Sequence, residues 1–131
     1  PSGGAGLQAD IEALLAQGCH AAPAVTALTV QDTVNVSDFR VLDREWVLAQ
    51  ANAVLNDSEV AAVKLGMLGS LEMVDTVVEL LQAHPHLPMV CDPVLRAGGG
   101  GRLELVRCAL GVLHHLPALS DFNLAGRDYC P

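Results

Sequence analysis

The sequence opens with Pro1-Ser2-Gly3-Gly4-Ala5-Gly6-Leu7-Gln8-Ala9-Asp10, a glycine-rich stretch that runs directly into apolar residues at helical spacing. Glycine carries no Cβ, so its backbone N–H groups can lie close to a bound molecule, and a helix start favours polar or anionic partners. The stretch therefore predicts a ligand pocket at the beginning of a helix. Taken alone, it fits an ordinary loop-to-helix entry equally well.

The composition predicts one globular α/β domain. The chain has 131 residues, of which 51% are hydrophobic and 3% aromatic. This content is ample for a buried core. The apolar residues are mostly Ala, Val and Leu, which suits helices packed on a buried parallel sheet better than an aromatic-rich sandwich.

Charge and cysteine content narrow the class of partner. The formal net charge is −8 and Lys plus Arg number seven, which argues against a nucleic-acid or anionic-membrane surface. No stretch approaches the roughly 20 apolar residues of a membrane span. We expect a small-molecule partner and a cytoplasmic location.

The four cysteines have no paired metal spacing, which favours free thiols over a disulfide; they are Cys19, Cys91, Cys108 and Cys130.

The first half of the chain predicts a helix, two strands and a second helix. Apolar residues at helical spacing predict a helix over 5–17, with Gly18 as its C-terminal cap. Small and β-branched residues over 21–30 predict a buried strand, and 34–42 alternates as a second, short strand. Asp43 is expected to cap a helix that ends near 57 and carries one apolar side, comprising Trp46, Val47, Ala51, Val54 and Leu55.

The second half continues the alternation. Residues 61–68 predict a buried strand, Ser70 a helix cap, 89–94 a short strand, and 103–115 a last helix. Strands that alternate with helices imply right-handed crossovers and a mainly parallel sheet. Residues 120–131 have no clear period, and we assign them no element.

Four stretches, in this order and spacing, resemble the hydroxymethylpyrimidine/phosphomethylpyrimidine kinases of thiamine biosynthesis, members of the ribokinase-like superfamily. They are PSGGAGLQAD at 1–10, TALTVQDT at 26–33, KLGML at 64–68 and DPVLRAGGGG at 92–101. The resemblance implies a three-layer α/β/α sandwich with a mainly parallel sheet. It also implies phosphorylation of hydroxymethylpyrimidine and then of its monophosphate, with ATP and Mg²⁺ as cofactors and commonly a homodimer.

The resemblance also assigns site residues. The substrate pocket would draw on Ala5 and Gly6 at the glycine turn and on Thr29, Gln31, Met67 and Val94, with Asp92 near the phosphates and magnesium. An amide both donates and accepts hydrogen bonds, which suits an aminopyrimidine edge, while a thioether and a branched aliphatic side chain suit the ring faces. Judged without the resemblance, Gln31 and Met67 fit a satisfied strand end and core packing better.

The resemblance covers 1–119, about half of a family member, and leaves 120–131 as a divergent tail. The chain begins with Pro1 inside a motif, so we expect residues upstream. The family's asparagine- and glutamate-containing motif, its adenine site and the glycine-rich helix start that holds the catalytic base have no counterpart here. We therefore expect this chain alone to phosphorylate nothing. The alternatives are a non-catalytic pyrimidine-binding remnant, a pyridoxal-type kinase, and a chain that does not fold stably by itself.

Two further features have competing interpretations. Lys64 interrupts an apolar strand; because a buried lysine is costly unless it is paired, we favour an acidic partner over a ligand role. His84 and His86 flank Pro85 in a break between elements. Their spacing can bind a metal, but a solvated loop is the better interpretation.

Overall fold

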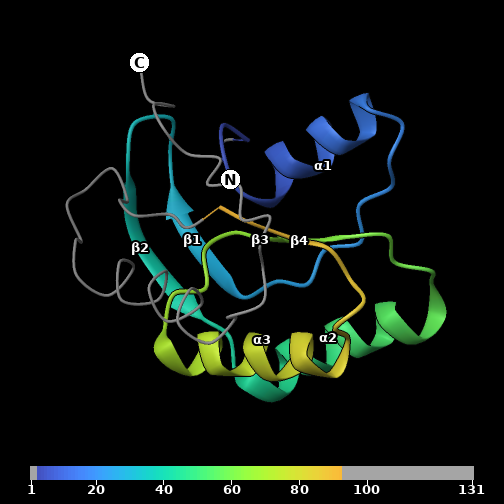
Figure 1. Cartoon of the computed structure of the whole chain (residues 1–131). Helices are drawn as coiled ribbons and strands as arrows, with labels where there is room; N and C mark the ends of the chain where they lie inside the picture. The colour runs from blue at the N-terminus through green and yellow to red at the C-terminus, as the bar shows by residue number, and fades with distance from the viewer. Residues whose placement is uncertain (1–2, 93–131) are drawn as a thin grey trace.

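Helices lie on both sides of the strands (Figure 1). The computed structural model describes residues 3–92, with α1 on one side of the strands and α2 and α3 on the other. In chain order the elements are α1 (Leu7–Ala16), β1 (Ala27–Gln31), β2 (Val36–Val41), α2 (Arg44–Asp57), β3 (Val63–Leu65), α3 (Leu71–Ala83) and β4 (Met89–Cys91). The mixed α/β class is therefore confirmed.

The expected mainly parallel sheet is wrong for the first two strands. β1 and β2 pair antiparallel, from Ala27 opposite Val41 to Gln31 opposite Val36. The connection between them is four residues long, and a parallel pair needs a crossover of a dozen or more. Asp32 closes the turn, because its carboxylate accepts the backbone N–H groups of Val34 and Asn35 at 2.8 Å each. The turn chemistry thus fixes the hairpin.

β3 and β4 form the parallel pair that the alternation predicts. Val63 lies opposite Met89 and Leu65 opposite Cys91, and α3 provides the crossover between the two strands. Both strands are shorter than the apolar runs that predict them. In residues 3–92 the two strand pairs are separate two-stranded sheets, so one continuous sheet is not what this part of the chain forms.

The core lies between the β3–β4 pair and the helices α2 and α3. Its buried apolar residues come mostly from α3, with others from β3, β4 and α2; they are Met73, Val74, Val77, Val78, Leu81, Val47, Leu65, Leu68 and Cys91. Trp46 was expected on the packed side of α2, but it is 67% exposed. It is Val47, the next residue along the helix, that is buried.

The N-termini of α2 and α3 differ in their side-chain capping. Ser70 caps α3 as predicted, since its hydroxyl accepts the backbone N–H of Met73 at 3.1 Å. Asp43 precedes α2 as expected, but its side chain makes no capping bond. The one buried polar residue of the described chain is Thr76, whose hydroxyl donates to the Glu72 carbonyl and accepts from Arg44.

The first helix ends as predicted but packs loosely. Gly18 has φ 76°, and the backbone N–H groups of Gly18 and Cys19 donate to the Leu15 and Leu14 carbonyls. This is the hydrogen-bond pattern of a Schellman cap. None of the ten residues of α1 is buried, and Leu15 is 70% exposed. The apolar stripe that predicts the helix therefore stays largely accessible.

Some expectations concern residues beyond the described part. The helix expected over 103–115, the site residue Val94 and the tail over 120–131 all lie outside residues 3–92. In the described part, no helix is long and apolar enough to cross a membrane.

Candidate functional site: the glycine turn, the hairpin face and the ends of the parallel strands

The glycine turn leads into α1 through a residue that must be glycine. Gly6 is the N-cap residue and has φ 76° and ψ −159°, a backbone conformation that residues with a Cβ rarely adopt. Its carbonyl accepts the backbone N–H of Asp10 at 3.0 Å. A Cβ built on Gly6 would meet nothing within 4 Å, and Ala5 is exposed. The turn therefore offers an open approach to its backbone.

One face of the hairpin carries the two polar residues assigned to the pyrimidine. Thr29 and Gln31 are two residues apart on β1, so their side chains share a face. The Gln31 amide nitrogen donates to the Thr29 hydroxyl at 2.6 Å. A bulge between Val30 and Gln31 shifts the register there, and bulges redirect side chains. Within residues 3–92, no hydrogen bond to the amide oxygen of Gln31 is present, so it can act as an acceptor.

Phe39 is a residue of this face that sequence reasoning did not single out. It lies directly opposite Thr29 in the antiparallel pair, and opposed residues project to the same face. Phe39 is 40% exposed. The signal available in the sequence was an aromatic residue in a short strand paired to the TALTVQDT stretch, but it could be used only once the register was known.

The loop after β3 contacts the base of the same hairpin. The Met67 carbonyl accepts the Thr26 hydroxyl at 2.7 Å, across 41 residues of sequence. Gly69 has φ 81°, and a Cβ there would lie 2.7 Å from Val41 and 3.6 Å from the Phe39 ring. Gln31 lies at the far end of the strand, and no hydrogen bond among the described residues joins it to Met67.

Lys64 lies between two carboxylates. Its ammonium nitrogen is 2.5 Å from an oxygen of Asp10 on α1 and 3.8 Å from an oxygen of Asp92, which follows β4. The Asp92 backbone N–H donates to the Leu65 carbonyl at 2.8 Å, so the parallel ladder fixes the position of this acid. The expected acidic partner of Lys64 is confirmed.

Asp92 fits a solvated magnesium contact better than a complete metal site. Its side chain is 44% exposed, and a carboxylate oxygen is a ligand that Mg²⁺ accepts while keeping several waters. No group of three or more His, Cys, Asp or Glu side chains in residues 3–92 could hold a metal ion. Any Mg²⁺ at Asp92 would therefore depend on water and on phosphate oxygens for the rest of its shell.

Cys91 stands next to Asp92 but is not a candidate nucleophile. Burial raises the pKa of the Cys91 thiol, and the neighbouring Asp92 carboxylate raises it further. A thiolate is the reactive form, so this environment suppresses reactivity. Cys91 is 4% exposed and belongs to the buried core. Cys19, by contrast, is a free and exposed thiol.

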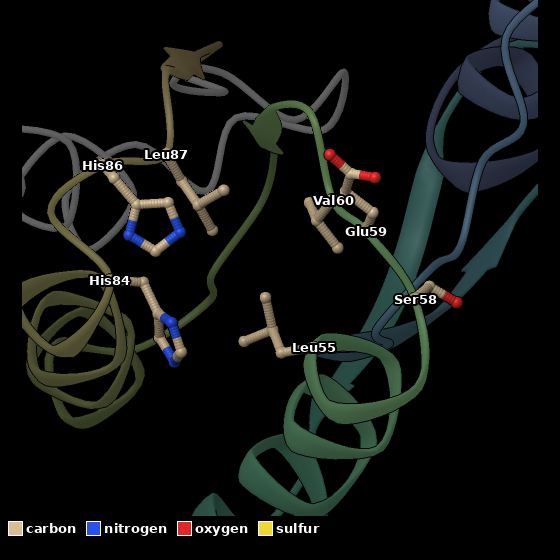
Figure 2. A pocket seen from close by; sticks show the side chains of 7 residues that line it. All are labelled: Leu55, Ser58, Glu59, Val60, His84, His86 and Leu87. Atoms are coloured by element: carbon tan, nitrogen blue, oxygen red, sulfur yellow. The ribbon is translucent and has the colours of Figure 1, made fainter.

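A small cavity of about 270 Å³ lies at the opposite ends of β3 and β4 (Figure 2). It is bounded by the end of α2 and by the two segments that lead into the strands; its lining residues are Leu55, Ser58, Glu59, Val60, His84, His86 and Leu87. The rings of His84 and His86 meet edge to face, 6.1 Å between centroids. In Figure 2 the Glu59 carboxylate and the Ser58 hydroxyl point away from the imidazoles. The cavity shares no residue with the predicted pyrimidine site.

Sequence comparison identifies relatives along most of the chain. The sequence model of the family described as phosphomethylpyrimidine kinase matches residues 1–113. A hydroxymethylpyrimidine/phosphomethylpyrimidine kinase from Haemophilus influenzae is 40% identical over 119 residues, which is 91% of this chain and 44% of that protein. The chain thus spans less than half the length of this relative.

Solved structures agree with the sequence match. The crystal structure of phosphomethylpyrimidine kinase from Clostridium difficile 630 superposes with a TM-score of 0.71 at 33% identity, over 88% of this chain and 48% of that one. A structure described as the last common ancestor of HMPPK and PLK/HMPPK vitamin kinases gives a TM-score of 0.66 at 30% identity, over 87% of this chain and 49% of that one. The chain therefore has a fold similar to about half of each of these two structures.

Proposed function

Because the chain belongs to the phosphomethylpyrimidine kinase family, we propose that it provides the pyrimidine-binding part of an enzyme that phosphorylates hydroxymethylpyrimidine and its monophosphate with ATP. Residues 1–119 would belong to the kinase domain. The complete domain would be a three-layer α/β/α sandwich, since α1 and the α2–α3 pair already lie on opposite sides of the strands (Figure 1).

The observation that carries the proposal is the Thr29–Gln31 pair on the hairpin face. With its amide nitrogen held by the Thr29 hydroxyl at 2.6 Å, Gln31 presents a fixed amide edge instead of a freely rotating one. An aminopyrimidine has an exocyclic N–H donor beside a ring nitrogen acceptor, and an amide matches this pair. Holding the amide in advance lowers the entropy lost on binding.

The other assigned residues would complete the pocket. Ala5 and Gly6 would contribute exposed backbone at the glycine turn, and Met67 and Val94 apolar contacts to the ring. Asp92 would lie toward the phosphates and hold Mg²⁺ through water. Magnesium supplies charge neutralisation when phosphoryl groups transfer; the task of these residues is to bind and orient the alcohol.

The first test is calorimetric titration of hydroxymethylpyrimidine into the purified chain, with a thermal melt of the same sample. We expect saturable binding and a cooperative melt. Gln31→Ala should weaken binding about tenfold or more, because two hydrogen bonds to the ring are lost. Gln82→Ala is the matched control, since Gln82 is an exposed glutamine of α3. Equal affinity in wild type and Gln31→Ala would remove the proposed role of Gln31.

Phosphoryl transfer needs a separate measurement. With ATP, Mg²⁺ and hydroxymethylpyrimidine, we expect no turnover by these 131 residues, because the sequence has no counterpart of the glycine-rich helix start that would hold the base and stabilise the transferred group. Turnover at a rate typical of kinases would contradict this expectation. Binding without turnover fits either a part of an enzyme or a non-catalytic pyrimidine-binding protein, and adding the remaining part of a family member distinguishes them.

A further inference from the structure

Three charged side chains from three elements meet beside the glycine turn. Asp10 lies in the first turn of α1, Lys64 is the central residue of β3, and Asp92 directly follows β4. Both carboxylates lie within 3.8 Å of one ammonium nitrogen. All three side chains are partly shielded from solvent, with exposed fractions between 29% and 44%. The cluster therefore joins the helix on one side of the strands to the ends of both parallel strands.

The helix α1 packs loosely, so these three charged residues can contribute to holding it in place. None of the ten residues of α1 is buried, so apolar contact alone fixes the helix weakly. Isolated helices shorter than about 12 residues are marginal in water, which means that an undocked α1 would also unwind. Asp10 is one helical turn from Gly6, and its N–H donates to the Gly6 carbonyl. The position of Asp10 therefore also determines the position of the glycine turn.

We propose that Lys64 is a positioning residue that holds α1, and with it the glycine turn, over the ends of β3 and β4 by pairing with Asp10 and Asp92 at once. Lys64 also offsets the repulsion between the two carboxylates, which would otherwise face each other across a short gap. The consequence of this positioning for ligand binding rests on the proposed pyrimidine site, because the glycine turn and Asp92 both belong to that site. The mechanical role of Lys64 does not depend on that site.

Hydrogen exchange of the α1 amides in the full chain tests the mechanical role directly. We expect Asp10→Asn to speed exchange in α1 about twofold to fivefold, the range for a partly exposed ion pair, while α3 is unaffected. Lys64→Met should have a larger effect than Asp10→Asn, because it leaves two carboxylates facing each other. Adding Asp10→Asn to Lys64→Met should then slow exchange again, since the repulsion is removed. Lys64→Arg should retain most of the protection.

Glu79→Gln is the matched control. It neutralises an acid in a different ion pair, Arg44–Glu79 at 2.6 Å between α2 and α3, without touching α1. Exchange in α1 should stay at the wild-type rate in this variant. Raising the salt from about 20 to 500 mM should speed α1 exchange in wild type and not in Asp10→Asn, because screening acts on the same pair. Unchanged α1 exchange in both Asp10→Asn and Lys64→Met would overturn the proposal.

Ligand binding separates this role from the proposed function. If the chain binds hydroxymethylpyrimidine, Asp10→Asn should weaken binding by the same twofold to fivefold factor without shifting the melting midpoint of the core, and Lys64→Arg should bind nearly as wild type. If wild type binds no pyrimidine, the proposed function fails, while the exchange rates of α1 still decide the role of Lys64.

Discussion

Phe39 shows at the scale of a single residue how pairing register creates a candidate site. In sequence it is one aromatic residue in a short strand, whereas the register places it opposite Thr29, two residues before Gln31 on β1. Phe39 is 40% exposed, so part of its side chain is accessible to a ligand. An aromatic ring next to an amide is a suitable wall for a flat heterocycle.

We predict that Phe39→Ala weakens hydroxymethylpyrimidine binding about threefold to tenfold, the value of one aromatic contact, while the melting temperature changes little. Trp46→Ala is the control, because Trp46 is an exposed aromatic residue on α2, away from the hairpin face. Calorimetric titration of both variants decides it. Equal losses in the two variants would show that Phe39 is not part of the site.

Cys91 leads to a prediction about pH. Burial, and then the Asp92 carboxylate, raise the pKa of the folded thiol above its unfolded value of about 8.5. When the pKa of a group is higher in the folded protein than in the unfolded chain, the group contributes its full stabilisation at pH values below the unfolded pKa. This stabilisation is lost as the pH rises toward the folded pKa. Urea unfolding should therefore show stability falling above about pH 8.5. Cys91→Val should reduce this fall.

Alkylation gives an independent check on the same residue. At pH 8, peptide mapping after iodoacetamide treatment should find the exposed Cys19 modified much faster than Cys91. Similar rates for the two thiols would contradict the burial of Cys91.

At the scale of elements, Gly69 determines how the parallel pair meets the hairpin. It lies between β3 and α3 with φ 81°, and a Cβ there would approach Val41 to 2.7 Å. Both the backbone conformation and the contact demand glycine. The hairpin base and the β3–α3 connection can lie together only because this residue has no side chain.

We expect Gly69→Ala to lower the free energy of unfolding by about 1–3 kcal/mol, the usual cost of a strained backbone conformation, with the contact to Val41 added. Gly66→Ala is the matched control three residues earlier, because a Cβ there meets nothing within 4 Å. Urea denaturation measures both. A Gly69→Ala variant as stable as Gly66→Ala would mean that the hairpin does not pack on this loop.

At the scale of the whole molecule, stability is unevenly distributed. The buried cluster lies between the β3–β4 pair and the helices α2 and α3, whereas α1 has no buried residue. Local opening follows such differences in burial. Native-state hydrogen exchange should find the slowest amides in α3 and the fastest helical amides in α1.

We predict that Met73→Ala costs about 2–5 kcal/mol in urea unfolding, because Met73 is 1% exposed and its removal leaves a cavity. Leu15→Ala, on the open side of α1, should change stability by less than about 0.5 kcal/mol. If Leu15→Ala proved as costly as Met73→Ala, α1 would be part of the cooperative core. The ion pair of Lys64 would then be a minor contributor to its docking.

Local chemistry made much of the structure predictable from sequence. The helix stripes and the Gly18 and Ser70 caps follow from periodicity and capping. Lys64 has the acidic partner that the sequence predicted, although its side chain is 36% exposed and not buried. The four sequence stretches at 1–10, 26–33, 64–68 and 92–101 also predicted the family. These features depend on residues close in sequence or on the chemistry of one side chain.

Only the tertiary structure decided the burial of Val47 in place of Trp46, the exposure of α1 and the position of Phe39. Each depends on which segments meet in space, whereas the four-residue connection between β1 and β2 already requires an antiparallel pair. The sequence by itself thus determined the order of the elements in residues 3–92, the approximate ends of the helices and the family, whereas the strands are shorter than their apolar runs predict. The arrangement that brings Asp10, Lys64 and Asp92 together was decided by packing between distant segments.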